Sequence, residues 1–161
     1  MNRVLFHRIG IGASIALGII FVVAGFGKIF TGVEGIERIF NPFPSFLTPA
    51  VTDTAFELLP YLEIIIGLLL IIGVVPRLAG VVSILLIAGF ITNNAWVLGQ
   101  GRGYEPCSCF GVLDRIVGLR ISTTHSLYLD IVMLALAFIT IFGLQGRIVN
   151  VRPRFLPRRD V

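Results

Sequence analysis

Four long runs of apolar residues divide the chain, and each is long enough to cross a lipid bilayer. They cover residues 9–30, 54–75, 78–99 and 124–145, close to the roughly 20 residues that a spanning helix needs. A backbone in lipid must satisfy its own hydrogen bonds, and these runs lack the strict alternation of a barrel strand. The pattern therefore predicts an all-α integral membrane four-helix bundle in residues 1–146, followed by a basic tail in residues 147–161.

The first run follows Arg3 and Arg8, and a basic start before an apolar core is also typical of a secretory signal peptide. A signal core has roughly 7 to 15 apolar residues and ends at a small-residue cleavage site. Residues 9–30 form a longer run, and no such site closes it. We therefore expect a retained first helix.

Glycines recur inside the apolar runs, among them Gly18, Gly25, Gly67 and Gly89. In a soluble helix an interior glycine weakens the structure. Between helices in lipid, a missing side chain lets two backbones approach closely. We expect these glycines to lie at helix contacts.

The thirteen lysines and arginines are unevenly distributed between the two ends of the expected helices. Basic residues are more frequent on the cytoplasmic side of a membrane. The larger group therefore places both termini and the turn near residue 76 in the cytoplasm, and residues 31–53 and 100–123 outside. The larger group is Arg3, Arg8, Arg77, Arg147, Arg152, Arg154, Arg158 and Arg159, and the smaller is Lys28, Arg38, Arg102, Arg115 and Arg120.

The net charge of +4 does not require a nucleic-acid partner. Juxtamembrane basic clusters bind anionic lipid headgroups, and the tail in residues 147–161 fits that pattern. Nothing in this tail resembles a nucleic-acid-binding module. We expect lipid, and no nucleic acid, as its partner.

The first outer segment has apolar Val33, Ile36, Ile39 and Phe40 at helical spacing, with charged residues between them. This spacing predicts a short amphipathic helix lying on the membrane surface. Such a helix either covers the bundle or forms a docking surface for a partner protein. The second outer segment contains another short amphipathic stretch after its cysteines.

Ionisable and amide residues inside the spans gather in their outer halves. A polar group in lipid needs a partner or a water-lined cavity. Lys28 could pair with Glu63 or Asp130 and so fix the packing of the bundle. Alternatively, these residues line a polar pocket beneath the cysteine segment that accepts protons or holds a small polar ligand. The candidates are Lys28, Glu57, Glu63, Asn93, Asn94, Asp130 and His125.

The chain has two cysteines, Cys107 and Cys109, both in the second outer segment. Outside the cytoplasm such a pair can persist as a disulfide. A ring this small strains a disulfide, and strained, exposed disulfides are the labile ones that undergo exchange. A fixed structural disulfide is the alternative. A metal site is disfavoured, because structural zinc takes about four ligands and His7 is expected on the opposite side of the membrane.

Three sequence elements make the chain resemble the DoxX and MauE group of small four-helix bacterial membrane proteins. They are "AGFGKIF" in the first run, "LPYLEIIIGLLLIIGVVPRLAG" across the second and third, and "CSCFG" before the fourth. The resemblance extends from about residue 9 to residue 144, and its CxCFG element points to the MauE-like branch.

This resemblance implies a protein of the bacterial inner membrane that helps to mature an extracytoplasmic partner. Cys107 and Cys109 would be its redox pair, Glu63 its acidic residue in the second helix, and a quinone is a candidate electron acceptor. Ser108 and Leu129 stand where family members often have glycine and arginine. A positive charge for Asp130 would then have to come from Lys28.

Two functions follow from these observations. The first is a thiol–disulfide oxidoreductase or maturation factor that acts through the cysteine pair on an extracytoplasmic protein. The second is a non-catalytic small subunit that assembles or stabilises a larger membrane complex. Transport is disfavoured, because the polar residues lie in one half of the bundle and form no continuous path.

Overall fold

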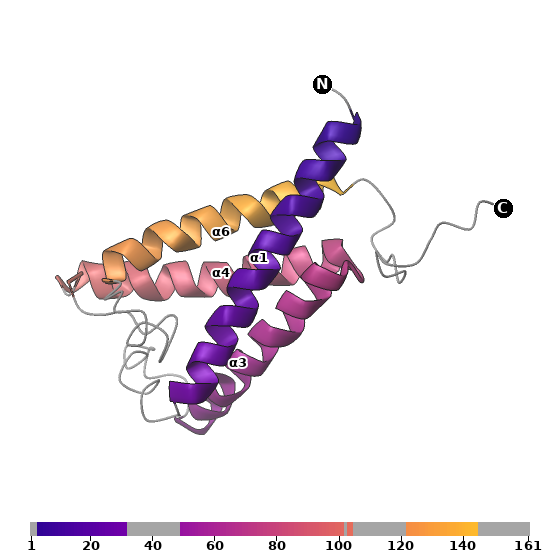
Figure 1. Cartoon of the computed structure of the whole chain (residues 1–161). Helices are drawn as coiled ribbons and strands as arrows, with labels where there is room; N and C mark the ends of the chain where they lie inside the picture. Colours follow the sequence, from indigo (N-terminus) through magenta and orange to yellow (C-terminus); the bar gives the residue numbers. More distant parts are fainter. Residues whose placement is uncertain (1–2, 32–48, 102, 105–121, 145–161) are drawn as a thin grey trace.

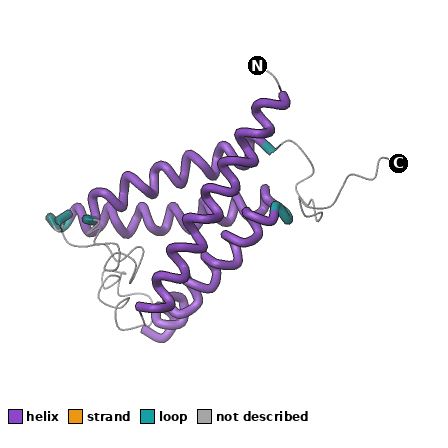
Figure 2. Tube along the Cα trace, viewed as in Figure 1, coloured by secondary structure: helices purple, strands orange, loops and turns teal. Residues whose placement is uncertain are grey.

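Four α-helices make up the part of the chain that the computed structural model describes, which is residues 3–31, 49–101, 103–104 and 122–144. Figure 2 shows these residues as helices with a few short loops and turns, and no β-strand among them. The predicted all-α fold is confirmed. The helices are α1 (Arg3–Thr31), α3 (Pro49–Ile72), α4 (Pro76–Gly99) and α6 (Thr123–Gly143).

Three of these helices are long and apolar enough to cross a membrane, over Leu5–Phe30, Pro76–Gly99 and Thr123–Gly143. They contain most of the first, third and fourth predicted runs. The second run lies largely on α3, whose crossing of the membrane stays a prediction. The helices begin before the apolar runs do, and α3 continues through Pro60. Hydropathy indicates where a helix meets lipid, whereas the helix itself extends into polar residues.

The helices form two antiparallel pairs that cross each other (Figure 1). In one pair α1 packs along α3, and in the other α4 packs along α6. Contact between α1 and α6 joins the pairs, while α3 and α4 share a smaller contact although a short turn connects them. Neighbours in the sequence are therefore not always the closest neighbours in space.

The turn between α3 and α4 is built from residues in unusual backbone conformations. Gly73 has a φ of 78° and its N–H donates to the Leu69 carbonyl at 2.9 Å. Val75 has a φ of 45°, which is unfavourable for a β-branched residue, and Pro76 then begins α4 with its fixed φ. In Figure 1 this turn, the start of α1 and the end of α6 all lie toward the same end of the molecule.

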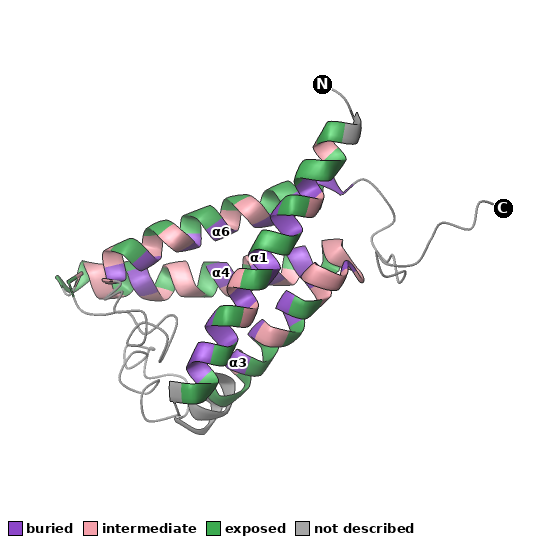
Figure 3. Cartoon of the chain, viewed as in Figure 1, coloured by how far each residue is buried: buried purple, intermediate pink, exposed green. Residues whose placement is uncertain are grey.

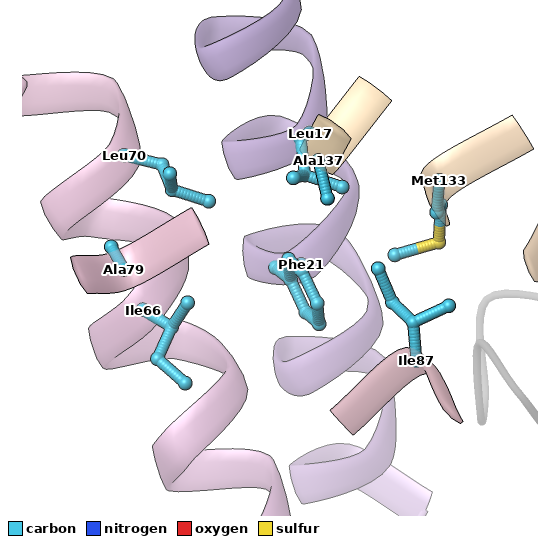
Figure 4. Close-up of a cluster of buried hydrophobic side chains, with 8 residues drawn as sticks. All are labelled: Leu17, Phe21, Ile66, Leu70, Ala79, Ile87, Met133 and Ala137. Atoms are coloured by element: carbon cyan, nitrogen blue, oxygen red, sulfur yellow. The ribbon is translucent and has the colours of Figure 1, made fainter. Parts of the chain in front are cut away.

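Each helix contributes two residues to one buried apolar core, drawn in Figure 4. Figure 3 shows buried positions on the inward faces of the helices and exposed positions on the outward faces. Many outward positions are large and apolar, for example Leu85 and Phe142. Such a surface suits lipid rather than water. The core residues are Leu17, Phe21, Ile66, Leu70, Ala79, Ile87, Met133 and Ala137.

Glycines bring α1 into backbone contact with its two neighbours. A Cβ atom on Gly18 would lie 2.7 Å from the Gly67 carbonyl oxygen of α3, so a larger residue would force the helices apart. A Cβ atom on Gly10 would lie 2.8 Å from the backbone of Gly143 in α6. The prediction is wrong for Gly89, which is exposed and has nothing within 4 Å of a built Cβ atom. Sequence alone did not show which way this glycine faces.

Hydroxyl groups inside the helices find acceptors on the backbone, as a lipid environment requires. Ser83, Thr92 and Thr140 each donate to the carbonyl four residues earlier, at 2.7 to 2.8 Å. Ser14 instead donates across the helix interface to the Leu70 carbonyl, at 2.8 Å. This bond joins α1 to α3 at the level of the apolar core.

Candidate functional site

A buried ion pair joins α1 and α3. Lys28 Nζ donates to Glu63 Oε1, and the two residues are 7% and 0% exposed. The close approach of the helices makes this pairing geometrically accessible, because a Cβ atom on Gly25 would lie 3.2 Å from Glu63 Cβ. The sequence left open whether Lys28 pairs with Glu63 or with Asp130, and the structure selects Glu63.

A second polar contact joins α4 and α6. The Asn94 side-chain amide donates to Asp130 Oδ2 at 2.7 Å and to the Ser126 hydroxyl at 3.2 Å. All three side chains are buried. Ser126 and Asp130 are four residues apart, so they lie on the same face of α6. The amide of Asn94 therefore meets both groups from one position.

Lys28 also connects the two helix pairs. Its Nζ lies 4.6 Å from the centroid of the Phe90 ring of α4, within the range of a cation–π interaction. Its charge also interacts with the Asp130 carboxylate of α6. We refer to Lys28, Glu63, Asn94, Ser126 and Asp130 as the polar cluster. Every described helix contributes at least one residue to it.

The polar cluster leaves one carboxylate oxygen unmatched. Glu63 Oε2 is buried and has no hydrogen-bond partner among the residues that the structure describes. Within the cluster, one ammonium group faces two carboxyl groups. A buried charge without a partner is strongly unfavourable. This oxygen is therefore the position at which the cluster can accept a further donor.

The cluster lies toward the end of the bundle that borders the cysteine segment. Lys28 is close to the end of α1, and Ser126 is close to the start of α6. The Thr124 hydroxyl donates to the Gly103 carbonyl at 3.2 Å, which holds together the described residues on either side of positions 105–121. The polar cluster and the two ends of the cysteine segment thus belong to the same end of the fold.

A family model described as methylamine utilisation protein MauE matches residues 6–143 of the chain. The chain belongs to the MauE family. No curated protein and no solved structure matches it. Together with the three long apolar helices, this membership makes the chain a multi-pass membrane protein.

This MauE protein does not bring all the predicted site residues into the polar cluster. Glu57 is exposed on α3 and Asn93 is half-buried beside Asn94. His125 is exposed, and its Nδ1 shares a hydrogen bond with the Ser122 hydroxyl at 2.7 Å. Among the described residues, no group of three or more His, Cys, Asp or Glu side chains comes together as metal ligands would.

Cys107 and Cys109 lie outside the described residues of this MauE protein, as do the amphipathic stretches expected in the two outer segments and the basic tail. The redox pair, the fixed disulfide and the surface helices remain predictions from the sequence. Ser126 and Phe90 are the members of the site that the sequence reasoning missed. A signal existed for both, because each lies four residues before a predicted site residue, on the same helix face.

Proposed function

We propose that this MauE protein is a membrane maturation factor that acts on an extracytoplasmic partner by thiol–disulfide exchange at Cys107 and Cys109. The observation that carries the proposal is the family match. The matched region of the chain, residues 6–143, includes the cysteine pair. A second observation supports it: the helix ends on either side of the pair lie at the end of the bundle where polar residues are buried.

The partner gains a disulfide in two successive exchange steps. A thiolate of the partner attacks the Cys107–Cys109 disulfide, and one sulfur of the pair leaves as a thiolate. A second thiolate of the partner then displaces the remaining sulfur. The partner has lost two electrons, and the pair has gained them as two thiols.

Reoxidation of the pair needs a two-electron acceptor. A quinone, the class that the family resemblance implies, would take two electrons and two protons and leave as a quinol. Among the described residues, the buried side-chain nitrogen donors at this end are Lys28 and Asn94, and both already donate to carboxylates. These two side chains can offer a quinone carbonyl only the hydrogens that are not used in those bonds. We therefore assign no residue to a quinone site.

The orientation that we propose places both termini in the cytoplasm and the cysteines outside the bacterial inner membrane. The start of α1, the turn between α3 and α4, and the end of α6 share one end of the fold (Figure 1). The larger group of basic residues flanks the same end in the sequence. Both observations favour a cytoplasmic location for it.

The partner that we propose is an extracytoplasmic protein of methylamine utilisation, since the family description names that process. Thiol trapping in intact cells tests this directly with the variants Cys107→Ser and Cys109→Ser. One variant should accumulate a mixed disulfide with an extracytoplasmic protein, because its single thiolate can attack a disulfide of the partner while the second cysteine that would release the mixed disulfide is missing. Ser108→Ala, which keeps both thiols, is the matched control and should accumulate none.

The competing function is a non-catalytic subunit of a larger membrane complex. It would be supported if both cysteine variants matured the partner as the wild type does, and if the chain purified in fixed stoichiometry with other membrane proteins. In that case the cysteine pair would be a fixed disulfide or would have no role in exchange.

A further inference from the structure

Each helix of the bundle presents an exposed aromatic side chain two residues away from its member of the polar cluster. Measured from Lys28, Glu63, Asn94 and Asp130, the aromatic residue is displaced toward the same end, the end that borders the cysteine segment. Two residues correspond to about 3 Å along a helix and to roughly half a turn. The aromatic residue therefore faces outward at nearly the level of the buried polar group. The four are Phe30 (73% exposed), Tyr61 (55%), Trp96 (56%) and Tyr128 (66%).

Tyrosine and tryptophan side chains concentrate where a membrane meets water. The chain has one tryptophan and three tyrosines, and all four are exposed at this end, including Tyr104. This distribution places the interface of the outer leaflet at the level of the polar cluster. The cluster thus lies close to headgroups and water rather than at the centre of the hydrocarbon layer.

We propose that the polar cluster is a proton-binding site, in which either Glu63 or Asp130 carries one exchangeable proton on its carboxyl group. Charge balance is the first argument. The elements that meet here supply Lys28 as the cation and two carboxyl groups, while α4 supplies the neutral Asn94 and Phe90. One proton makes the buried group neutral, and a buried charge without compensation is instead removed by protonation.

The unmatched oxygen is the second argument. Glu63 Oε2 is fully buried and lacks a donor among the described residues. Protonation removes the negative charge that makes such an oxygen unfavourable, and it needs no further ligand to do so. A metal ion would require several oxygen ligands. It would also be repelled by the Lys28 ammonium, which is bonded to the same carboxylate. Glu57 and His125, two further ionisable side chains nearby in the sequence, are exposed.

Infrared difference spectroscopy of the full chain in lipid nanodiscs tests the site, because a protonated carboxyl group has its own C=O band. The wild type should show one such band, which disappears as the pH is raised. Glu63→Gln and Asp130→Asn should each abolish the band, since Lys28 then neutralises the single carboxylate left. Lys28→Met should roughly double it once the medium is acidic enough to protonate both carboxyl groups. Glu57→Gln, at the exposed position of the same helix, should leave it unchanged.

Three further results bear on the proposal, and none of them depends on the cysteines. On transfer to heavy water the band should shift without delay, as expected for a site at the interface. A wild type without a protonated band at any pH would overturn the proposal. In that case a second cation would have to compensate the charge of the two carboxylates. It would be a metal ion if the stability of the protein depended on sodium or potassium, and otherwise a basic side chain from elsewhere in the chain. A band that persists unchanged in both Glu63→Gln and Asp130→Asn would overturn it equally.

Discussion

Replacing Lys28 by methionine should destabilise the bundle strongly. Methionine retains much of the length of the lysine side chain but leaves Glu63 buried without its cation. Removing one partner of a buried ion pair costs about 3–5 kcal/mol. Loss of the cation–π contact with Phe90 adds about 0.5–2 kcal/mol, which improved packing of the methionine offsets in part. We expect a net loss of about 3–5 kcal/mol in the free energy of unfolding at neutral pH.

Reversible unfolding in mixed micelles, with an increasing fraction of denaturing detergent, measures this loss. The double variant Lys28→Met/Glu63→Gln should recover most of it, because the charge of Glu63 is then removed together with the cation that paired with it. Arg8→Met is the matched control, since it removes a positive charge from an exposed position of the same helix. It should change stability by no more than about 0.5 kcal/mol.

The loss of stability caused by Lys28→Met should also depend on pH. The cost of Lys28→Met arises from the charge on Glu63, so it should shrink as the medium is acidified and the carboxylate takes up a proton. A double variant whose loss equals the sum of the two single losses would refute the argument, because additivity means that the residues are not coupled.

Two further substitutions test the packing and the second polar contact by the same unfolding measurement. Gly18→Ala should cost about 1–3 kcal/mol, since its Cβ atom would press on the backbone of α3, whereas Gly89→Ala should change stability by at most about 0.5 kcal/mol. Equal effects at the two glycines would contradict the observed close approach. Asn94→Ala should cost about 1.5–3 kcal/mol, because the buried Asp130 carboxylate loses a donor, and Asn93→Ala should cost less. The reverse order for the two asparagines would mean that α4 is rotated about its axis.

The sequence was sufficient to predict the fold class and the end of the bundle that holds the polar residues. The length and apolarity of the runs predict the fold class. The position of each polar residue within its run predicts the end of the bundle at which these residues gather. The extra residues at the start of α1 and α3 were not predicted. Residues 3–8 and 49–53 are helical but mix apolar with charged or polar residues, so a search for uninterrupted apolar runs does not include them.

The rotation of each helix about its axis was the information that the sequence lacked. Glu57 and Glu63 are six residues apart, which places them about 120° apart around α3, so only one can face the bundle. That much follows from spacing, but which one faces inward depends on packing against α1. The same holds for Asn93 and Asn94, of which only the second is buried. Lys28 pairs with Glu63 rather than with Asp130 for a related reason, because α1 and α3 approach each other closely at Gly25.

The pairing of helices has a consequence for the order in which the chain enters the membrane. Glu63 follows Lys28 by 35 residues, so the first pair can form while later helices are still being synthesised. The hydrogen bond between Asn94 and Asp130 can form only after the 36 residues that separate them have been synthesised. At 5–20 residues per second, this wait lasts about 2–7 s. We expect α4 to spend that interval beside the translocation channel, and its release into lipid to follow the arrival of α6.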